Sequence, residues 1–216
     1  AVIFLLEAAV RWGQKWIDKR FFREEINAER MLGELSDRVR TIIEPRPLVQ
    51  TVVHGIAETL HVSRIAAFHE LNGTFAPDYS VGYESGVPPV SFEPSGALVG
   101  HLKDRRVPAK VYWDDPEAWV NRDLSGPEAQ LLLPINGRDR LLGFLSLGPR
   151  RGDAPYARTE VQLLQSVAVQ TGLALENARL AQEVVRETAQ RERIHRELEI
   201  AWEVQQTLYP KSVALP

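Results

Sequence analysis

The chain has 216 residues, of which 44% are hydrophobic and 25% charged, and its formal net charge is −3. This composition is ordinary for a folded domain and argues against wholesale disorder and against a membrane bundle. The charge gives no positive excess for a nucleic-acid surface. The chain contains no cysteine, which excludes disulfides, thiolate metal sites and cysteine nucleophiles and fits the reducing cytoplasm, the location that we expect.

The N-terminal segment combines an apolar run at residues 1–6 with an aromatic and cationic stretch at residues 12–23. The run is too short to span a bilayer, which needs about 20 residues. Aromatic and basic residues together are typical of sequence just cytoplasmic of a membrane helix. Two interpretations stay open: the segment follows a membrane anchor of a longer protein, on the cytoplasmic side of an inner membrane, or it is an amphipathic helix in a dimer contact.

A helix is expected at residues 26–43, where apolar residues recur three and four apart. This spacing is that of a heptad seam between two helices. We therefore expect a first region, residues 1–44, that pairs with the same region of a second copy. The seam residues expected in this helix are Leu32, Leu35, Val39 and Ile42.

The middle of the chain reads as a mixed α and β segment. A helix is expected at residues 48–60, after the prolines at 45 and 47 end the first helix. Strands at 64–70 and 74–81 are expected to form a hairpin, because Asn72-Gly73 supplies the positive φ angles of a tight turn. The later elements expected are a loop at 83–93, a helix at 94–103, and strands at 107–113, 130–135 and 141–147.

The strand at residues 141–147 leaves neither of its faces polar, so both sides of the sheet must be covered. Helices can cover one side, and the segment from 83 to 127 must then cover the other. A sheet lidded by loops is a natural place for a small-molecule cavity. The candidate lining residues are Phe68, Tyr79, Tyr83, His101, Tyr112 and Trp113.

Residues 158–208 contain no proline and one glycine, Gly172, and are expected to form a single helix. At 1.5 Å per residue this helix would be roughly 75 Å long. Its later part has one apolar stripe at heptad spacing, interrupted by Glu187, Arg191 and Gln205. A helix with one apolar stripe needs a partner, and we expect a parallel homodimer. The seam residues expected here are Val184, Ile194, Leu198, Ala201 and Leu208.

This order of elements, together with residues 133–135, 143–147 and 173–180, closely resembles a GAF domain. The resemblance covers about residues 47–180. It implies an α+β fold in which a central antiparallel sheet has helices on one face and a loop-lidded pocket on the other, flanked by long coiled-coil helices. We place the GAF sensory domain at residues 45–180 and an exit helix and linker at residues 181–216.

A second resemblance lies at residues 196–210, which look like the linker before the catalytic domain of bacterial SpoIIE-type, metal-dependent serine/threonine phosphatases. A Glu-Leu, Ala, Val-Gln-Gln and Pro pattern carries it, and Tyr209 departs from the usual leucine. In that family the metal-binding aspartates lie downstream of the linker. The resemblance therefore implies a regulatory sensory and dimerisation module, without catalytic residues or a metal site of its own, for a phosphatase domain in the same chain.

Other functions stay open beside this one. The module could belong to a histidine kinase or a nucleotide cyclase, or could be a ligand-free dimerisation spacer. The ligand or cofactor is unspecified, but a bilin attached through cysteine is excluded because the chain has none. A free-standing methionine-sulfoxide reductase of GAF fold is disfavoured for the same reason, because that chemistry uses thiols.

Overall fold

The computed structural model describes residues 29–84, 86, 88, 90–111, 129–152 and 154–208. The chain divides into two units, Ala1–Glu176 and Asn177–Pro216. The expectations for residues 1–28 lie outside the described part of the chain. The helix α5, Arg158–Leu208, begins in the first unit and continues into the second.

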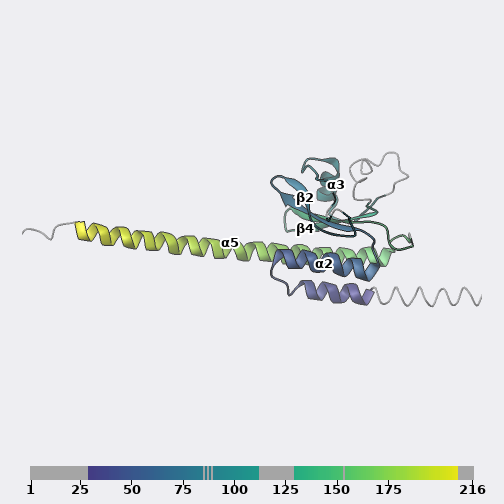
Figure 1. The fold of residues 1–216 in the computed structure, drawn as a ribbon, viewed down its shortest axis with the longest axis horizontal. Helices are drawn as coiled ribbons and strands as arrows, with labels where there is room; N and C mark the ends of the chain where they lie inside the picture. The colour runs from purple at the N-terminus through teal and green to yellow at the C-terminus, as the bar shows by residue number, and fades with distance from the viewer. Residues whose placement is uncertain are drawn as a thin grey trace, which may run out of the picture. The chain divides into compact units, whose positions relative to one another are not determined.

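The first unit is built on a five-stranded antiparallel sheet with the strand order β2-β1-β5-β4-β3. In Figure 1, α2 lies along one side of this sheet and α3 lies on the other. The strands are β1 (Ile65–Leu71), β2 (Thr74–Val81), β3 (Ala109–Lys110), β4 (Leu131–Asn136) and β5 (Leu141–Leu147). The expected α+β fold is thereby confirmed.

The turn between β1 and β2 is the expected one, since Asn72 and Gly73 have φ angles of 52° and 83°. The strand expected at residues 107–113 is shorter than predicted, because only Ala109–Lys110 pairs with β4. Pro108 precedes this pair and has no N–H for a ladder hydrogen bond, so pairing begins after it. Residues 112 and 113 lie outside the described part.

The helices differ from expectation at their ends as well as at their starts. The first described helix covers residues 29–39 and ends four residues before the expected residue 43. The next, α2 (Pro45–Leu60), begins at Pro45 and not at residue 48, because proline in a first helical turn sacrifices an N–H that would have no partner there. The short helix α3 (Ala97–Arg105) begins after its N-cap Gly96, three residues later than expected.

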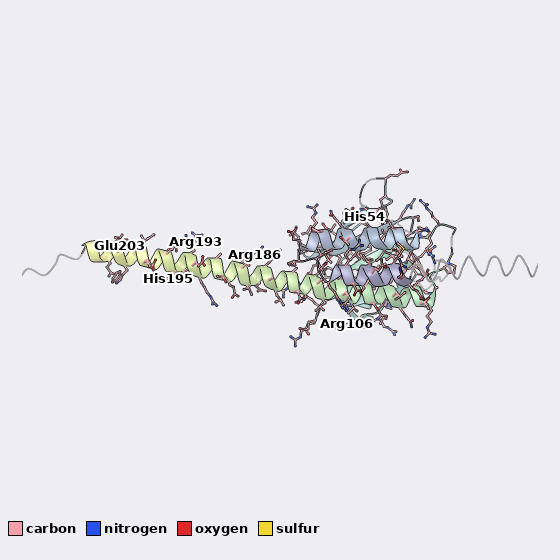
Figure 2. The ribbon with its side chains drawn as sticks, turned by 90° about the horizontal axis from the view of Figure 1, so that it is seen from below. His54, Arg106, Arg186, Arg193, His195 and Glu203 are labelled. Atoms are coloured by element: carbon pink, nitrogen blue, oxygen red, sulfur yellow. The ribbon has the colours of Figure 1, made fainter. Side chains whose placement is uncertain are left out.

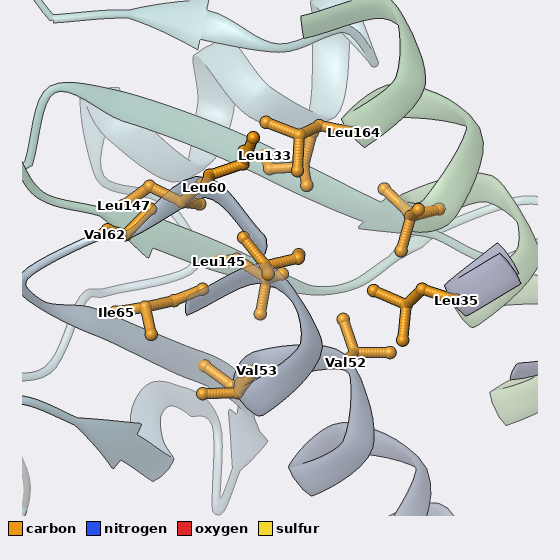
Figure 3. Packing of buried hydrophobic residues seen from close by; sticks show 14 of the residues in the cluster. Leu35, Val52, Val53, Leu60, Val62, Ile65, Leu133, Leu145, Leu147 and Leu164 are labelled. Carbon is orange, nitrogen blue, oxygen red and sulfur yellow. The ribbon is translucent and has the colours of Figure 1, made fainter. Parts of the chain in front are cut away.

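We call the face of the sheet opposite α3 the helical face. One core fills the space between this face and the helices that pack on it. Side chains of α2, the first part of α5 and one face of each central strand meet there (Figure 3). The labelled residues in this view include Val52 and Val53 of α2, Leu145 of β5 and Leu164 of α5. Burial of this apolar surface is the main force that holds the helices on the sheet.

The apolar stripe of the first helix belongs to this same core. Leu32, Leu35 and Val39, here called the N-terminal stripe, are 1%, 5% and 0% exposed. Leu35 packs on α2 at Gly55, where an added Cβ would lie 2.6 Å from Leu35 Cδ1. Ile42 is partly buried against the same core. The structure thus corrects the expected use of this stripe, because its own chain covers the side chains that we assigned to a contact with a second copy.

The described part of the second unit is the remaining part of α5, up to Leu208. Every side chain from residue 179 to residue 205 is exposed. Figure 2 shows Arg186, Arg193 and His195 along this helix, with their side chains extending outward from the ribbon. Among the described residues, no helix is both long and apolar enough to cross a membrane.

Candidate functional site

A cluster of phenylalanine rings fills part of the space between the sheet and α3, here called the α3 face. Phe68 of β1 and Phe144 of β5 stack with ring centroids 4.8 Å apart. Phe92 meets both rings edge-on, and Phe75 lies 6.1 Å from Phe144. All of these side chains are buried. These packed rings therefore form an aromatic core on this part of the α3 face.

The expected pocket residues are divided between the two faces. Phe68 lies in the phenylalanine cluster, but Tyr79 packs against the core of the helical face, and its hydroxyl lies 2.5 Å from His54 Nε2. The reason is a β-bulge: β2 carries one extra residue where Ala67 pairs with Tyr79 and Phe68 pairs with Pro77. A bulge reverses the alternation of side chains beyond it. The prediction that Tyr79 lines the pocket is therefore wrong.

The other candidates lie on or near the α3 face. Tyr83 is partly buried against the core there, and His101 lies half-buried on α3. Tyr112 and Trp113 lie outside the described residues. The structure therefore brings Phe68 and Tyr83 to one core and places His101 on the helix that covers it.

Ser146 of β5 is a buried polar group on the α3 face that the sequence analysis did not identify. Its side chain is 0% exposed and its Oγ has no hydrogen-bond partner. Its neighbours in the sheet are Ala66 and Leu132, both apolar. An unpaired buried hydroxyl costs about 1–3 kcal/mol, so a water molecule or a polar ligand atom that paired with it would be stabilising. A serine within an otherwise apolar strand is the one sequence signal for it.

A buried polar network joins the start of α5 to the rest of the first unit. Glu160 Oε2 accepts hydrogen bonds from Arg150 Nη1 at 2.9 Å and from the backbone N–H of Ala157 at 2.8 Å. Arg150 Nε donates to the carbonyl of Leu60, the last residue of α2. A carboxylate at a helix N-terminus also meets the positive end of the helix dipole. The network therefore fixes where α5 begins relative to α2.

Tyr156 extends this network to the sheet. Its hydroxyl donates to the Gly148 carbonyl at 2.7 Å, and its own carbonyl accepts from Lys110 Nζ. Burial raises the pKa of Tyr156 above its usual value, with Glu160 acting in the same direction and Arg150 opposing both. The phenol is therefore neutral throughout the physiological range and acts as a donor.

The second unit carries the expected seam residues on its surface. Val184, Ile194 and Leu198 are 63%, 48% and 63% exposed, and Ala201 is also exposed. The side chain of Leu208 lies outside the described residues. We call Leu180, Val184, Ile194, Leu198 and Ala201 the C-terminal stripe. Within the described part of its unit, no other element covers it.

The first unit also exposes large apolar side chains on its helices. Met31 of the first helix is 45% exposed, and Val169 and Leu173 of α5 are each 56% exposed. Val169 and Leu173 are four residues apart and so lie on the same side of α5. They were not among the predicted seam residues, although Leu173 precedes Leu180 by one heptad.

Within the described ranges, no group of three or more histidine, cysteine, aspartate or glutamate residues is placed to hold a metal ion. Among the described residues, the helices expose large apolar side chains, and the α3 face holds one buried hydroxyl without a hydrogen-bond partner, that of Ser146. The model of the GAF domain family matches residues 44–175. The chain belongs to the GAF domain family, whose members are sensory and regulatory signalling modules.

Solved structures share this fold at low sequence identity. The GAF domain of a phosphoenolpyruvate-protein phosphotransferase from Coxiella burnetii has 18% identity and a TM-score of 0.59, covering 73% of this chain and 98% of its own. The GAF domain of a putative sensor histidine kinase from Pseudomonas syringae pv. tomato has 16% identity and a TM-score of 0.55, covering 79% and 99%.

A third similar structure is an enzyme, the free methionine-R-sulfoxide reductase from Neisseria meningitidis in complex with its substrate. It has 12% identity and a TM-score of 0.56, and the match covers 70% of this chain and 89% of that one. A search of curated proteins finds no match. At these identities the likeness concerns the fold, so ligand and output have to be argued from the residues of this chain.

Proposed function

We propose that this chain is the sensory and dimerisation module of a bacterial SpoIIE-type serine/threonine phosphatase and relays a signal to that enzyme through α5. The observation that carries the relay is the exposed C-terminal stripe of the second unit. A single helix with an uncovered apolar stripe is unstable alone, and its own copy is the simplest partner. The resemblance of residues 196–210 to the phosphatase linker supports the choice of output.

The proposed dimer is parallel, because both copies of a following domain must leave on the same side. It uses the C-terminal stripe of the second unit and, in the first unit, the exposed side chains Met31, Val169 and Leu173. We expect sedimentation equilibrium to return a dimer for the 216-residue chain. A monomer at high micromolar concentration would refute this part of the proposal.

The proposed output is tested on the longer polypeptide. We expect the sequence after residue 216 to encode metal-binding aspartates, and the 216-residue chain to show no phosphatase activity with any divalent metal. A kinase or cyclase domain at that position would favour the alternatives within signalling. Metal-dependent hydrolysis of a phosphoprotein by the shorter chain would contradict the assignment of regulation to it.

The relay itself is tested at Glu187 and Arg191. Polar residues at core positions lower the stability of a coiled coil, so replacing them with leucine and isoleucine is expected to raise the melting temperature of the dimer. In the longer polypeptide the tighter helices should hold phosphatase output in one state. If the double variant melts higher yet the enzyme still responds to its signal, α5 is not the route of the relay.

A second candidate, a spacer without a ligand, is favoured by the phenylalanine cluster. Phe68, Phe92 and Phe144 already occupy part of the α3 face. Ser146 argues in the other direction, because its hydroxyl has no protein partner. Native mass spectrometry of the purified chain separates the two: a bound small molecule that is lost in Ser146→Val supports a sensor, and its absence from the wild type supports the spacer.

A further inference from the structure

Two oppositely charged residues interrupt the C-terminal stripe. With Val184 and Leu198 at heptad position a and Ile194 at position d, Arg191 falls at position a and Glu187 at position d. Within one helix, Glu187 Oε2 lies 3.8 Å from Arg191 Nη2, and the two side chains are 64% and 84% exposed. Both charges therefore stand at positions that a second helix would cover.

We infer that Glu187 and Arg191 form an ion-pair layer between two copies of this chain and that this layer selects both the partner and its register. The inference rests on the dimer proposed above. In a parallel coiled coil, a side chain at d packs into a hole of the partner that includes the following a position. The same hole contains the partner's Glu187, so Glu187 of each copy packs beside both Glu187 and Arg191 of the other. The d layer and the following a layer, together called the ion-pair layer, hold two glutamates whose charges two arginines compensate.

Within the described helix, heptad positions g and e provide no ion pairs that could select the partner or the register. Coiled coils usually place inter-helical ion pairs at positions g and e. In a parallel, in-register dimer the facing pairs are Glu183 with Thr188, Gln190 with His195, and Glu197 with Trp202. None of these facing pairs joins an acidic to a basic side chain of fixed charge.

The same layer opposes other registers. Sliding one helix by a heptad would set Glu187 against Ile194 and Leu198 of the other copy. A charge covered by apolar side chains without a partner is strongly destabilising. A coiled coil that lacks these two charges at these positions is disfavoured as a partner for the same reason.

A charge exchange in the whole 216-residue chain tests the layer. Glu187→Arg leaves only cations in it and Arg191→Glu only anions, so each variant alone should self-associate roughly tenfold or more weakly than the wild type. An equimolar mixture should recover wild-type association, because every arginine again meets a glutamate. Sedimentation equilibrium of each sample, with circular dichroism for helical content, gives the comparison.

The matched control exchanges two charges on the side of the helix away from the partner, Glu192→Arg with Arg196→Glu, which occupy heptad positions b and f. Its self-association should equal that of the wild type. If the wild type is a dimer but the single variants associate as well as it does, or their mixture does not recover, the ion-pair layer is overturned while the dimer stands. A monomeric wild type overturns both.

Discussion

The N-terminal and C-terminal stripes have the same heptad spacing but opposite surroundings. Leu35 in the first is 5% exposed, whereas Leu198 in the second is 63% exposed. Apolar periodicity shows that one side of a helix must be covered. It does not show whether the same chain or another copy covers it.

The difference follows from what else each unit contains. The helix at residues 29–39 is joined by a short connection to α2, and Gly55 of α2 leaves room for Leu35. Its stripe can therefore fold onto its own core. The described part of the second unit is one helix, so no other described element of that unit covers the C-terminal stripe.

The largest expected effect comes from truncating one leucine of each stripe. Leu35→Ala removes a buried side chain and should lower the free energy of unfolding by about 3 kcal/mol, equally at all protein concentrations. Leu198→Ala removes an exposed one, so it should leave the folding of the first unit unchanged and weaken association. Urea unfolding at several protein concentrations measures both effects.

Opposite results would reverse the comparison. If Leu198→Ala destabilises the first unit at high dilution, the C-terminal stripe is covered within its own chain. If the cost of Leu35→Ala depends on protein concentration, the N-terminal stripe contributes to a contact between copies.

Local sequence signals were sufficient for most of the fold. The Asn72-Gly73 turn fixed the first hairpin, and the apolar residues on both faces of β5 required a covered sheet. The extent of α5 followed from the lack of helix breakers at residues 158–208. Each of these signals lies within one segment of the chain.

The candidate site depended more on contacts between distant segments. The bulge in β2 places Tyr79 on the helical face. The local sequence of β2 contains no signal that predicts this bulge. The contact of Arg150 with Leu60 and Glu160 joins residues that are 90 and 10 positions apart. Such networks become visible only once the sheet has brought these segments together.

A smaller effect is expected from adding one methyl group to a helical glycine. Gly172 of α5 faces β4, where an added Cβ would lie 2.1 Å from the backbone oxygen of Asn136. Gly172→Ala should therefore lower the free energy of unfolding by about 1–3 kcal/mol through overpacking. This close approach explains the single glycine in a helix of 51 residues.

Gly33 provides the matched control because it also lies in a helix but has nothing within 4 Å of an added Cβ. Gly33→Ala should raise the free energy of unfolding by about 0.5–1 kcal/mol, since alanine favours helix and restricts the unfolded chain. Thermal melting of both variants measures the contrast. Equal shifts would show that α5 does not rest closely on the sheet at Gly172.

The smallest expected effect concerns the phenol of Tyr156 at the start of α5. Tyr156→Phe removes its hydrogen bond to the Gly148 carbonyl and should cost about 1 kcal/mol near pH 8. Because burial raises the pKa of Tyr156 in the folded chain, the phenol ionises first in the unfolded chain, whose tyrosines titrate near pH 10. The unfolded state then binds fewer protons than the folded one, so wild-type stability falls as the pH rises above that value. At pH 11 the loss from this group is about 1.4 kcal/mol, which cancels the advantage of tyrosine over phenylalanine.

Urea unfolding of both proteins at pH 8 and pH 11 should show the difference in the free energy of unfolding disappearing at the higher pH. As a control, both proteins should associate equally through the C-terminal stripe at pH 8. A difference that stays constant with pH would mean that the phenol is accessible to solvent in the folded chain and does not hold the start of α5 to the sheet.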